Sequence, residues 1–289
     1  MSNRLNPELR YHFNIRQFIH SALAEDTGDG DHTSLACIPA SAKGKAQLLV
    51  KESGIIAGVE LAEKIFKTVD AKLKVKIFIK DGSKIKVGDI ILTVEGNSRS
   101  ILLAERLILN CIQRMSGIAT RTHNYVQLCK GTKAKVIDTR KTTPNIRALE
   151  KWAVVLGGGA NHRIGLYDMI LIKDNHIDYA GGIKNAIDAA KKYLKEKNKK
   201  LAIEVEARGM DEVKEILAIG GIHRILLDNF SIADIKNALK LINGKYETEA
   251  SGGINEMNIR SYAKCGVDFI SVGALTHHIK SLDLSLKAI

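Results

Sequence analysis

The predicted fold class is α/β, and the second part of the chain is predicted to form a barrel, closed or incomplete, of six or seven βα units. Three observations carry this prediction. The rhythm of the sequence changes near residue 115, and from residue 136 short apolar runs alternate with amphipathic helical segments. The last four runs begin 22 to 23 residues apart, the spacing of successive βα units. No GxGxxG motif follows the first run, so a dinucleotide-binding sheet is not indicated.

The first part of the chain predicts a mixture of helices and short strands. Apolar residues between Leu9 and Leu23 approximate the period of an amphipathic helix, with Pro7 near its start. The acid-rich stretch 25–33 that follows is predicted to be a loop, because the ligand order of a calcium-binding loop is absent. Further helices are predicted at 59–69 and 98–130, and strands at 46–50, 73–79 and 90–94.

The strands predicted in the second part are 135–137, 169–172, 202–205, 224–227, 247–250 and 269–272. Amphipathic helices separate most of them, at 183–195, 211–219, 232–241 and 256–265. Parallel strands joined in this way end at a common edge, and in α/β barrels the reacting groups gather at the carboxyl ends of the strands. A functional site is therefore expected at these strand ends.

The composition is that of an ordinary globular protein with a basic excess. The chain of 289 residues has 44 Lys and Arg against 32 Asp and Glu, a formal charge of +12, and 45% hydrophobic residues. This argues against disorder, and no apolar run approaches the roughly 18 residues that span a bilayer. The basic excess leaves three explanations open: a nucleic acid partner, an anionic small molecule, or solvated lysines.

The cysteines favour a reducing compartment. Cys37, Cys111, Cys129 and Cys265 form no CxxC pair and have no His at metal-ligand spacing. Each lies in an apolar or helical stretch, so buried free thiols are expected, with two disulfides as the alternative. The N-terminal segment lacks the uninterrupted apolar stretch of a secretory signal. Together these features predict a cytoplasmic protein that has no membrane partner.

Every predicted strand of the second part ends in charged, hydroxyl or glycine residues. These ends are 138–141, 173–176, 204–206, 228–229, 251–253 and 271–273. One such end means little, but six in register predict a common site at the mouth of the barrel. The glycine-containing ends 251–253 and 271–273 close the last two units, where barrels commonly hold a phosphate with backbone N–H groups. Tight turns are the alternative for each glycine segment alone.

Acidic and basic side chains at these ends predict two further roles. Glu206 and Asp228 end neighbouring strands and could hold Mg²⁺, although Glu204 shares the face of Glu206 and spacing alone does not choose between them. The cationic or proton-carrying side chains of the first two units are Arg140, Lys141, His162, Arg163 and Lys173. So many positive charges would destabilise a closed core unless an anion neutralised them. The set predicts a ligand with several negative groups, bound with a metal.

Taken together, these motifs resemble the quinolinate phosphoribosyltransferases, also called carboxylating nicotinate-nucleotide pyrophosphorylases. The matching segments are 138–144, 157–163, 171–176, 204–206, 226–230, 249–254 and 271–276. The similarity extends over nearly the whole chain, from Glu25-Asp26 to the tail 283–287. Seven ordered motifs make this resemblance far more specific than any single pattern.

The resemblance implies a fold and an assembly. The fold is an N-terminal α/β sandwich domain over 1–115, joined by the tail 276–289, and an open, incomplete α/β barrel of about seven strands over 116–275. The assembly is a homodimer, with a hexamer as a larger form, in which Arg114 reaches into the neighbour's site. Read without the resemblance, Arg114 would be an ordinary residue of a helix surface.

The resemblance also implies an activity: transfer of phosphoribose from phosphoribosyl pyrophosphate to quinolinate with decarboxylation, in NAD biosynthesis. The expected substrate-binding residues are Arg114, Thr139, Arg140, Lys141, His162, Arg163, Lys173, Glu206, Asp228, Ser251, Gly252, Gly253, Ser271, Val272 and Gly273. Those expected to be catalytic are Lys141, Lys173, Glu206 and Asp228, with Mg²⁺ held by the two acids through the substrate. Pyridoxal phosphate is not required, because the ribosylated pyridinium ring serves as its own electron sink.

Two other functions are weighed against this one. A nicotinate phosphoribosyltransferase, or a molybdenum-associated homologue of the same fold, would share the barrel. Nicotinate has one carboxylate and needs fewer cations, so Arg163 and Lys173 favour the dicarboxylate. A nucleic-acid-binding protein would show basic patches interleaved with aromatics, but aromatics make up only 5% of the chain, and the lysines of 191–200 fit a solvated helix end.

Overall fold

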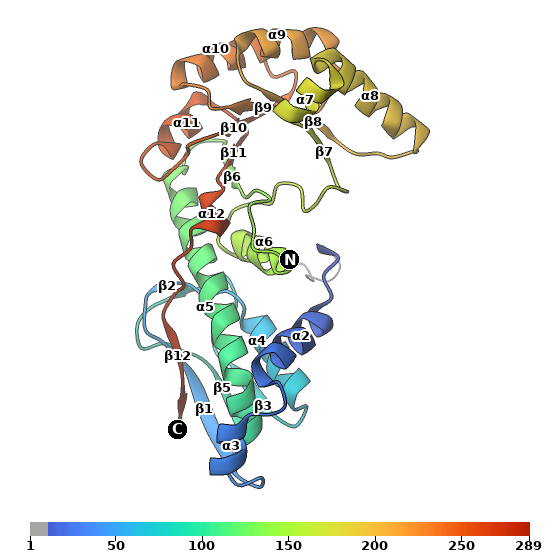
Figure 1. Cartoon of the computed structure of the whole chain (residues 1–289). Coiled ribbons are helices and arrows are strands. Elements are labelled where there is room, and N and C mark those ends of the chain that lie inside the picture. Colours follow the sequence, from blue (N-terminus) through green and yellow to red (C-terminus); the bar gives the residue numbers. More distant parts are fainter. Residues whose placement is uncertain (1–10) are drawn as a thin grey trace. The chain divides into compact units, whose positions relative to one another are not determined.

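The computed structural model describes residues 11–289, which divide into two compact units (Figure 1). The first unit comprises the described residues up to His123 together with 143–158 and 278–289. The second, here called the barrel unit, comprises 124–142 and 159–277. The domain boundary predicted at residue 115 stays a prediction, and helix α5 (Ser98–Leu128) runs through that position.

The first unit is built on a four-stranded antiparallel sheet in the order β12-β1-β5-β3. Its strands are β1 (Lys43–Val50), β3 (Lys74–Ile77), β5 (Ile90–Asn97) and β12 (Leu284–Ala288), and a separate ribbon pairs β2 (Gly54–Ile55) with β4 (Lys84–Ile85). The tail strand β12 pairs with β1, with Leu286 opposite Leu48. The first unit therefore contains both ends of the described chain.

The helices of the first unit are α2 (Ile15–Thr27), α3 (His32–Cys37), α4 (Val59–Val69), most of α5, and α6 (Arg147–Leu156). The prediction of one continuous helix from Leu9 to Leu23 is wrong. The backbone leaves the helical conformation at His12, where φ is +49°, and α2 begins after Asn14. The Asn14 side chain accepts the Gln17 N–H at 2.9 Å and so caps α2. Residues Pro7 and Leu9 lie outside the described part.

The loop predicted at 25–33 is shorter than expected. The first three of these residues complete α2, and α3 starts at His32 behind the cap Asp31. The Asp31 carboxylate accepts the Ser34 N–H at 3.0 Å, which accounts for an acid at this position without a metal. Three further helices, α6, α7 (Asp174–Ala180) and α12 (Ala274–His277), were not predicted.

The barrel unit contains six parallel strands in the order β6-β11-β10-β9-β8-β7. They are β6 (Lys135–Ile137), β7 (Ile170–Ile172), β8 (Ile203–Ala207), β9 (Arg224–Asp228), β10 (Glu247–Ser251) and β11 (Phe269–Ser271). A bridge between Ile137 and Ala160 adds one strand-like residue beside β6, with Ala160 N–H donating to Val136 O at 2.9 Å. The predicted α/β class and open barrel are confirmed, with six strands plus this bridge in place of about seven full strands.

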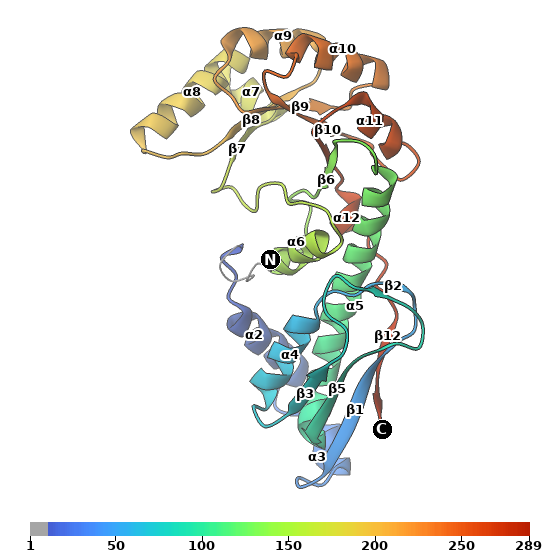
Figure 2. The ribbon, with the colours of Figure 1, turned by 180° about the vertical axis from the view of Figure 1, so that it is seen from behind.

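The longer helices of the barrel unit cover the outer face of the strands (Figure 2). They are α8 (Ile183–Glu196), α9 (Met210–Ile219), α10 (Ile232–Ile242) and α11 (Ile259–Cys265). The short helices α7 (Asp174–Ala180) and α12 (Ala274–His277) follow the carboxyl ends of β7 and β11. Because parallel strands share a direction, all six end at one edge, and the last residues of β8, β9 and β10 lie side by side. This edge positions the site.

Two other predictions can be compared with the structure. All four cysteines are free, as expected. Their predicted burial is wrong in part, because only Cys129 is buried, Cys111 and Cys265 are partly exposed, and Cys37 is exposed. Within the described residues, no helix is both long and apolar enough to cross a membrane.

Candidate functional site

A cavity of about 790 Å³ opens at the carboxyl ends of the barrel strands. All of its lining residues belong to the barrel unit: Thr139, Arg140, Lys141, His162, Arg163, Leu171, Lys173, Asp174, Glu206, Leu226, Asp228, Asn229, Glu249, Ser251, Gly252, Gly253, Ile254, Ser271, Gly273, Ala274 and His277. The structure therefore brings together every residue predicted for the substrates except Arg114 and Val272. A cavity of this size suits a small molecule.

The basic side chains of the cavity are largely unbalanced by acids. Within the described residues, Arg140, Lys141 and Arg163 have no carboxylate oxygen within 4.0 Å. Burial, and after it the neighbouring Arg140, lowers the pKa of the Arg163 guanidinium, whose Nη1 donates to Met169 O at 3.3 Å. Lys173 lies 4.0 Å from Glu206. This concentration of positive charge around one cavity is suited to a ligand with several negative groups.

Two carboxylates stand on neighbouring strands at the same edge. Burial, and after it the nearby Asp228, raises the pKa of Glu206, while Lys173 opposes that shift. Asn229 Nδ2 donates to Asp228 Oδ2 at 2.6 Å. Two adjacent carboxylates of this kind are stabilised by a cation or by hydroxyl donors between them.

The glycine segments after β10 and β11 bring backbone close to the cavity. Gly252 and Gly253 have φ of +95° and +59°, which side chains rarely adopt, and a Cβ on Gly252 would overlap the Asn229 side chain. A Cβ on Gly273 would lie 3.1 Å from the Lys141 Cδ atom. The N–H groups of these three glycines donate no hydrogen bond within the described part of the chain, so they are available to an anion.

Val272 plays a different part from its neighbours. Its side chain is buried, and its N–H donates to Ile137 O at 3.0 Å. Thr276 Oγ1 donates to Lys141 O at 2.8 Å and holds the two segments together. Val272 thus joins β11 to β6 and leaves Ser271 and Gly273 to line the cavity.

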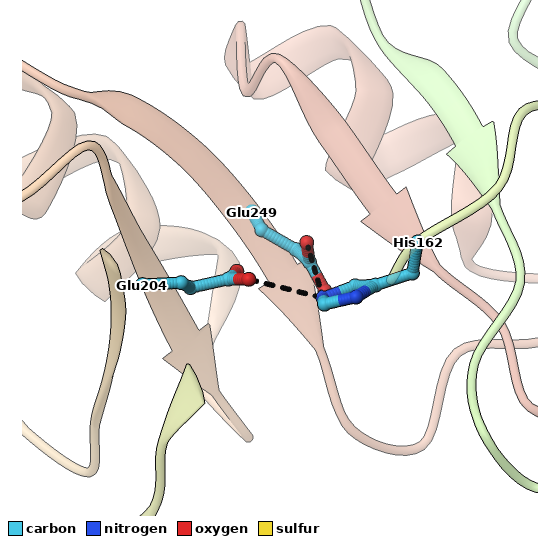
Figure 3. Close-up of side chains that lie close together, drawn as sticks. All are labelled: His162, Glu204 and Glu249. Carbon is cyan, nitrogen blue, oxygen red and sulfur yellow. Dashed lines mark ion pairs between the residues drawn. The ribbon is translucent and has the colours of Figure 1, made fainter. Parts of the chain in front are cut away.

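His162, Glu204 and Glu249 form a buried acid–histidine cluster (Figure 3), and His162 and Glu249 also line the cavity. His162 Nε2 is 3.0 Å from Glu204 Oε2 and 3.5 Å from Glu249 Oε2. Both glutamates are fully buried, and His162 is 9% exposed. His162 is fixed by its backbone too, because its N–H donates to the buried carboxylate of Asp138 at 3.0 Å.

The two glutamates of this cluster hold protons more strongly than ordinary carboxyl groups. Burial, reinforced by Glu204, raises the pKa of Glu249 to about 8. Burial also raises the pKa of Glu204, although Arg224 opposes the shift. The ligand atoms of His162, Glu204 and Glu249 lie within 4.8 Å of one another, so a negative charge on Glu204 favours the protonated form of Glu249.

Glu204 and Glu206 have distinct positions, which sequence spacing left open. Both point from β8 to the inside of the barrel, but only Glu206 lines the cavity, and Glu204 lies in the interior. Glu249 was missed because it stands inside β10. Strand alternation was the available signal, since Glu249 shares a face with the predicted Ser251.

Arg114 belongs to the first unit and is not among the residues that line the cavity. Its Nε and Nη2 atoms contact Glu150 Oε1 at 2.8 and 2.6 Å, and Nη2 also donates to Thr143 Oγ1 at 2.9 Å. Glu150 is 1% exposed. In this chain Arg114 therefore binds residues of its own unit.

An open α/β barrel with cations, paired carboxylates and glycine turns around one cavity defines an enzyme that binds small polyanions. Two family models match the chain: the N-terminal domain of quinolinate phosphoribosyl transferase over residues 31–116 and its C-terminal domain over 118–287. The chain belongs to the quinolinate phosphoribosyl transferase family.

Similar proteins cover the whole chain. A nicotinate-nucleotide pyrophosphorylase [carboxylating], chloroplastic, of Arabidopsis thaliana is 45% identical over 302 residues, covering 99% of this chain and 86% of the relative. A probable nicotinate-nucleotide pyrophosphorylase [carboxylating] of Bacillus subtilis is 38% identical, covering 95% and 93%. The crystal structure of NadC from Streptococcus pyogenes superimposes with a TM-score of 0.91 at 37% identity, over 100% of both chains.

Proposed function

We propose that this enzyme transfers phosphoribose from phosphoribosyl pyrophosphate to quinolinate with loss of CO₂, giving nicotinate mononucleotide and pyrophosphate for de novo NAD synthesis. The observation that carries the proposal is one cavity that joins unbalanced cations, two carboxylates and glycine turns. A nicotinate phosphoribosyltransferase or a molybdenum-associated homologue is not favoured, because relatives over the full chain are named for quinolinate or for the carboxylating reaction.

Quinolinate is a dicarboxylate, and the cavity offers cations for both of its negative groups. Arg140 and Arg163 supply planar guanidinium groups, which bind carboxylates through two parallel hydrogen bonds. Half-burial makes Arg163 a strong partner, because an incoming carboxylate replaces the water that the site has excluded. Binding of the substrate thus relieves the repulsion between the two guanidinium groups.

Phosphoribosyl pyrophosphate is expected to lie along the glycine side of the cavity. The free N–H groups of Gly252, Gly253 and Gly273 suit the phosphate oxygens, and Lys141 lies against Gly273. Lys141 and Lys173 are placed to offset the negative charge that develops on the departing pyrophosphate. These are the roles proposed for the two lysines in catalysis.

Glu206 and Asp228 are proposed to act at the ribose. They are hard oxygen donors on adjacent strands, and their mutual repulsion fits a site that gains a divalent cation, so the residues fit Mg²⁺. When bound, Mg²⁺ supplies charge neutralisation at the ribose hydroxyls and the pyrophosphate. The same carboxylates stabilise the positive charge that develops at C1 as the C1–O bond breaks.

Decarboxylation then follows on the ribosylated ring. When CO₂ leaves, the electron pair of the broken bond stays on C2, where the adjacent positive ring nitrogen stabilises it, and a proton from water then adds at C2. The proposed reaction therefore requires no pyridoxal phosphate. The chain has to hold the ring still while CO₂ leaves, which Arg140 and Arg163 do if they retain the other carboxylate.

Assembly and compartment are part of the proposal. A homodimer, or a hexamer built from dimers, would allow Arg114 to leave Glu150 and reach a neighbour's cavity. Support comes from the exposure of this ion pair, since the Arg114 side chain is 31% exposed. A cytoplasmic location fits the free thiols, although some relatives are named chloroplastic or mitochondrial.

The direct test is turnover with purified protein, phosphoribosyl pyrophosphate and Mg²⁺, offering quinolinate or nicotinate. Quinolinate should be consumed with equal amounts of CO₂ and nicotinate mononucleotide formed. Turnover of nicotinate without turnover of quinolinate would show that the proposal is wrong. Sedimentation of the same sample tests the dimer, and omission of Mg²⁺ tests the role of the metal.

A further inference from the structure

Arg224 stands at the start of β9, at the other end of the strand from Asp228. Residues 224, 226 and 228 share one face of the strand, and Leu226 and Asp228 line the cavity while Arg224 does not. Its side chain is only 14% exposed and its guanidinium stacks on the Phe269 ring, with Cζ 3.8 Å from the ring centre. Arg224 is thus a rigid cation inside the barrel, below the cavity floor.

The guanidinium of Arg224 forms ion pairs with two glutamates of the neighbouring strand β10. Nη2 lies 3.1 Å from Glu247 Oε2, and Nη1 lies 3.0 Å from Glu249 Oε2. The second contact uses the same Glu249 oxygen that lies 3.5 Å from His162 Nε2. Arg224 therefore fixes the position of an oxygen that faces His162.

His162 is held at both ring nitrogens. Arg163 N–H donates to His162 Nδ1 at 2.6 Å, which places the ring proton on Nε2. Nε2 then points to the oxygens of Glu204 and Glu249, so the ring lines the cavity with both nitrogens directed at protein groups.

We propose that Arg224 is a positioning residue of the quinolinate site, which acts through Glu249 to set the orientation of the His162 ring. The inference rests on the proposed function for its substrate, and Arg224 itself does not line the cavity. Without Arg224, Glu249 loses an ion pair to a permanent cation, so the oxygen that faces His162 Nε2 is no longer fixed in position.

Kinetics of Arg224→Met tests the proposal. The quinolinate KM should rise about tenfold or more, since a small displacement of a positioning group has effects of that size. The KM for phosphoribosyl pyrophosphate should stay within about twofold, and Arg224→Lys, which keeps the charge, should restore part of the loss. Arg260→Met, which removes an exposed arginine of α11, is the matched control and should leave both constants unchanged.

A double-variant cycle shows whether Arg224 acts through Glu249. In a Glu249→Gln background, which removes the charge that Arg224 holds, Arg224→Met should add less than about twofold to the quinolinate KM. Multiplicative effects, or equal rises in the KM of both substrates, would overturn the proposal. If Arg224→Met fails to fold, the isosteric Glu249→Gln alone should raise the quinolinate KM.

Nuclear magnetic resonance of isotope-labelled histidine provides a readout independent of turnover. The His162 ring nitrogens should show a protonated Nε2 in the native enzyme and should shift in Arg224→Met and Glu249→Gln, but not in Arg260→Met. Unchanged His162 resonances in Arg224→Met would refute the coupling. If the native enzyme does not use quinolinate, the proposed function is wrong, but the His162 resonances still test the coupling between Arg224 and His162.

Discussion

The two ends of the barrel strands both carry charged residues, but they balance charge differently. At the carboxyl ends, the cations Arg140, Lys141 and Arg163 have no carboxylate within 4.0 Å among the described residues. In the interior near the amino ends, Arg224 is paired with Glu247 and Glu249, each within 3.1 Å. Unbalanced charge predicts a ligand, whereas matched charge predicts an internal support for the site.

The basic residues of the barrel unit therefore fall into two groups, those that face the cavity without an acidic partner and those paired with acids inside the barrel. A cation at the cavity gains its partner when the substrate binds, so its removal should weaken binding or catalysis and leave folding nearly intact. A cation inside the barrel already has its partners, so its removal should change protonation and stability as well. The following predictions test this division, from the largest expected effect to the smallest.

The largest effect is expected from the carboxylates at the cavity. Asp228→Asn should lower kcat by about 10² to 10³-fold, because charge stabilisation at the reacting centre is lost in a site that excludes water. Steady-state rates over a range of Mg²⁺ concentrations measure this loss. Glu215→Gln, which neutralises an exposed acid of α9, should have the native rate. A native rate in Asp228→Asn would remove Asp228 from the mechanism.

Removal of an unbalanced cation should come next. Arg163→Met should lower kcat/KM for quinolinate by about 100-fold, the loss of a charge-assisted bidentate contact in a half-buried site. Thermal unfolding should be unchanged within a few degrees, since no ion pair is broken. A destabilised Arg163→Met with normal quinolinate kinetics would contradict the division between the two ends.

The buried acid should make stability depend on pH. The pKa of Glu249 in the folded protein is about 8, above its ordinary 4.5, so the folded state keeps a proton that the unfolded state releases between these values. The free energy of unfolding should fall as pH rises through this interval, by up to about 1.4 kcal/mol per pH unit, and level off above it. Denaturant unfolding at several pH values should show a shallower fall in Glu249→Gln. Identical slopes in both proteins would contradict the assigned proton.

A smaller effect is expected at the glycine side. Gly252→Ala forces a side chain into φ of +95° and against Asn229, which should cost about 1 to 3 kcal/mol of stability and raise the KM for phosphoribosyl pyrophosphate. Gly209→Ala is the control, because Gly209 is extended and has open space around it. Equal behaviour of the two variants would show that the left-handed turn is not needed.

The amphipathic helices were predictable from sequence, because the spacing of their apolar residues marks them without any knowledge of long-range contacts. The helix expected at 59–69 has the bounds of α4, and the helix expected at 183–195 is one residue shorter than α8. Helix α6 was missed although its sequence is amphipathic, and its charged residues Glu150 and Lys151 are buried together with its apolar ones. Helix α7 has only seven residues, too few to show an amphipathic period.

The cavity was predictable to a similar extent and for a similar reason. Parallel strands end together, so residues after each strand meet without any knowledge of long-range contacts. The contacts that position His162 from inside the barrel could not be predicted in that way. Glu249 and Arg224 lie inside strands or at their starts, and their meeting with His162 depends on how β9, β10 and the loop after Ala160 are arranged in space.

The central claim is that the unbalanced cations at the strand ends select a dicarboxylate. Calorimetric titration of the enzyme with quinolinate and with nicotinate, for the native protein and Arg163→Met, tests it most directly. The native enzyme should bind quinolinate at least about tenfold more tightly than nicotinate, and Arg163→Met should lose most of that preference. Equal affinities of the native enzyme for both ligands, or a preference that survives in Arg163→Met, would contradict the claim.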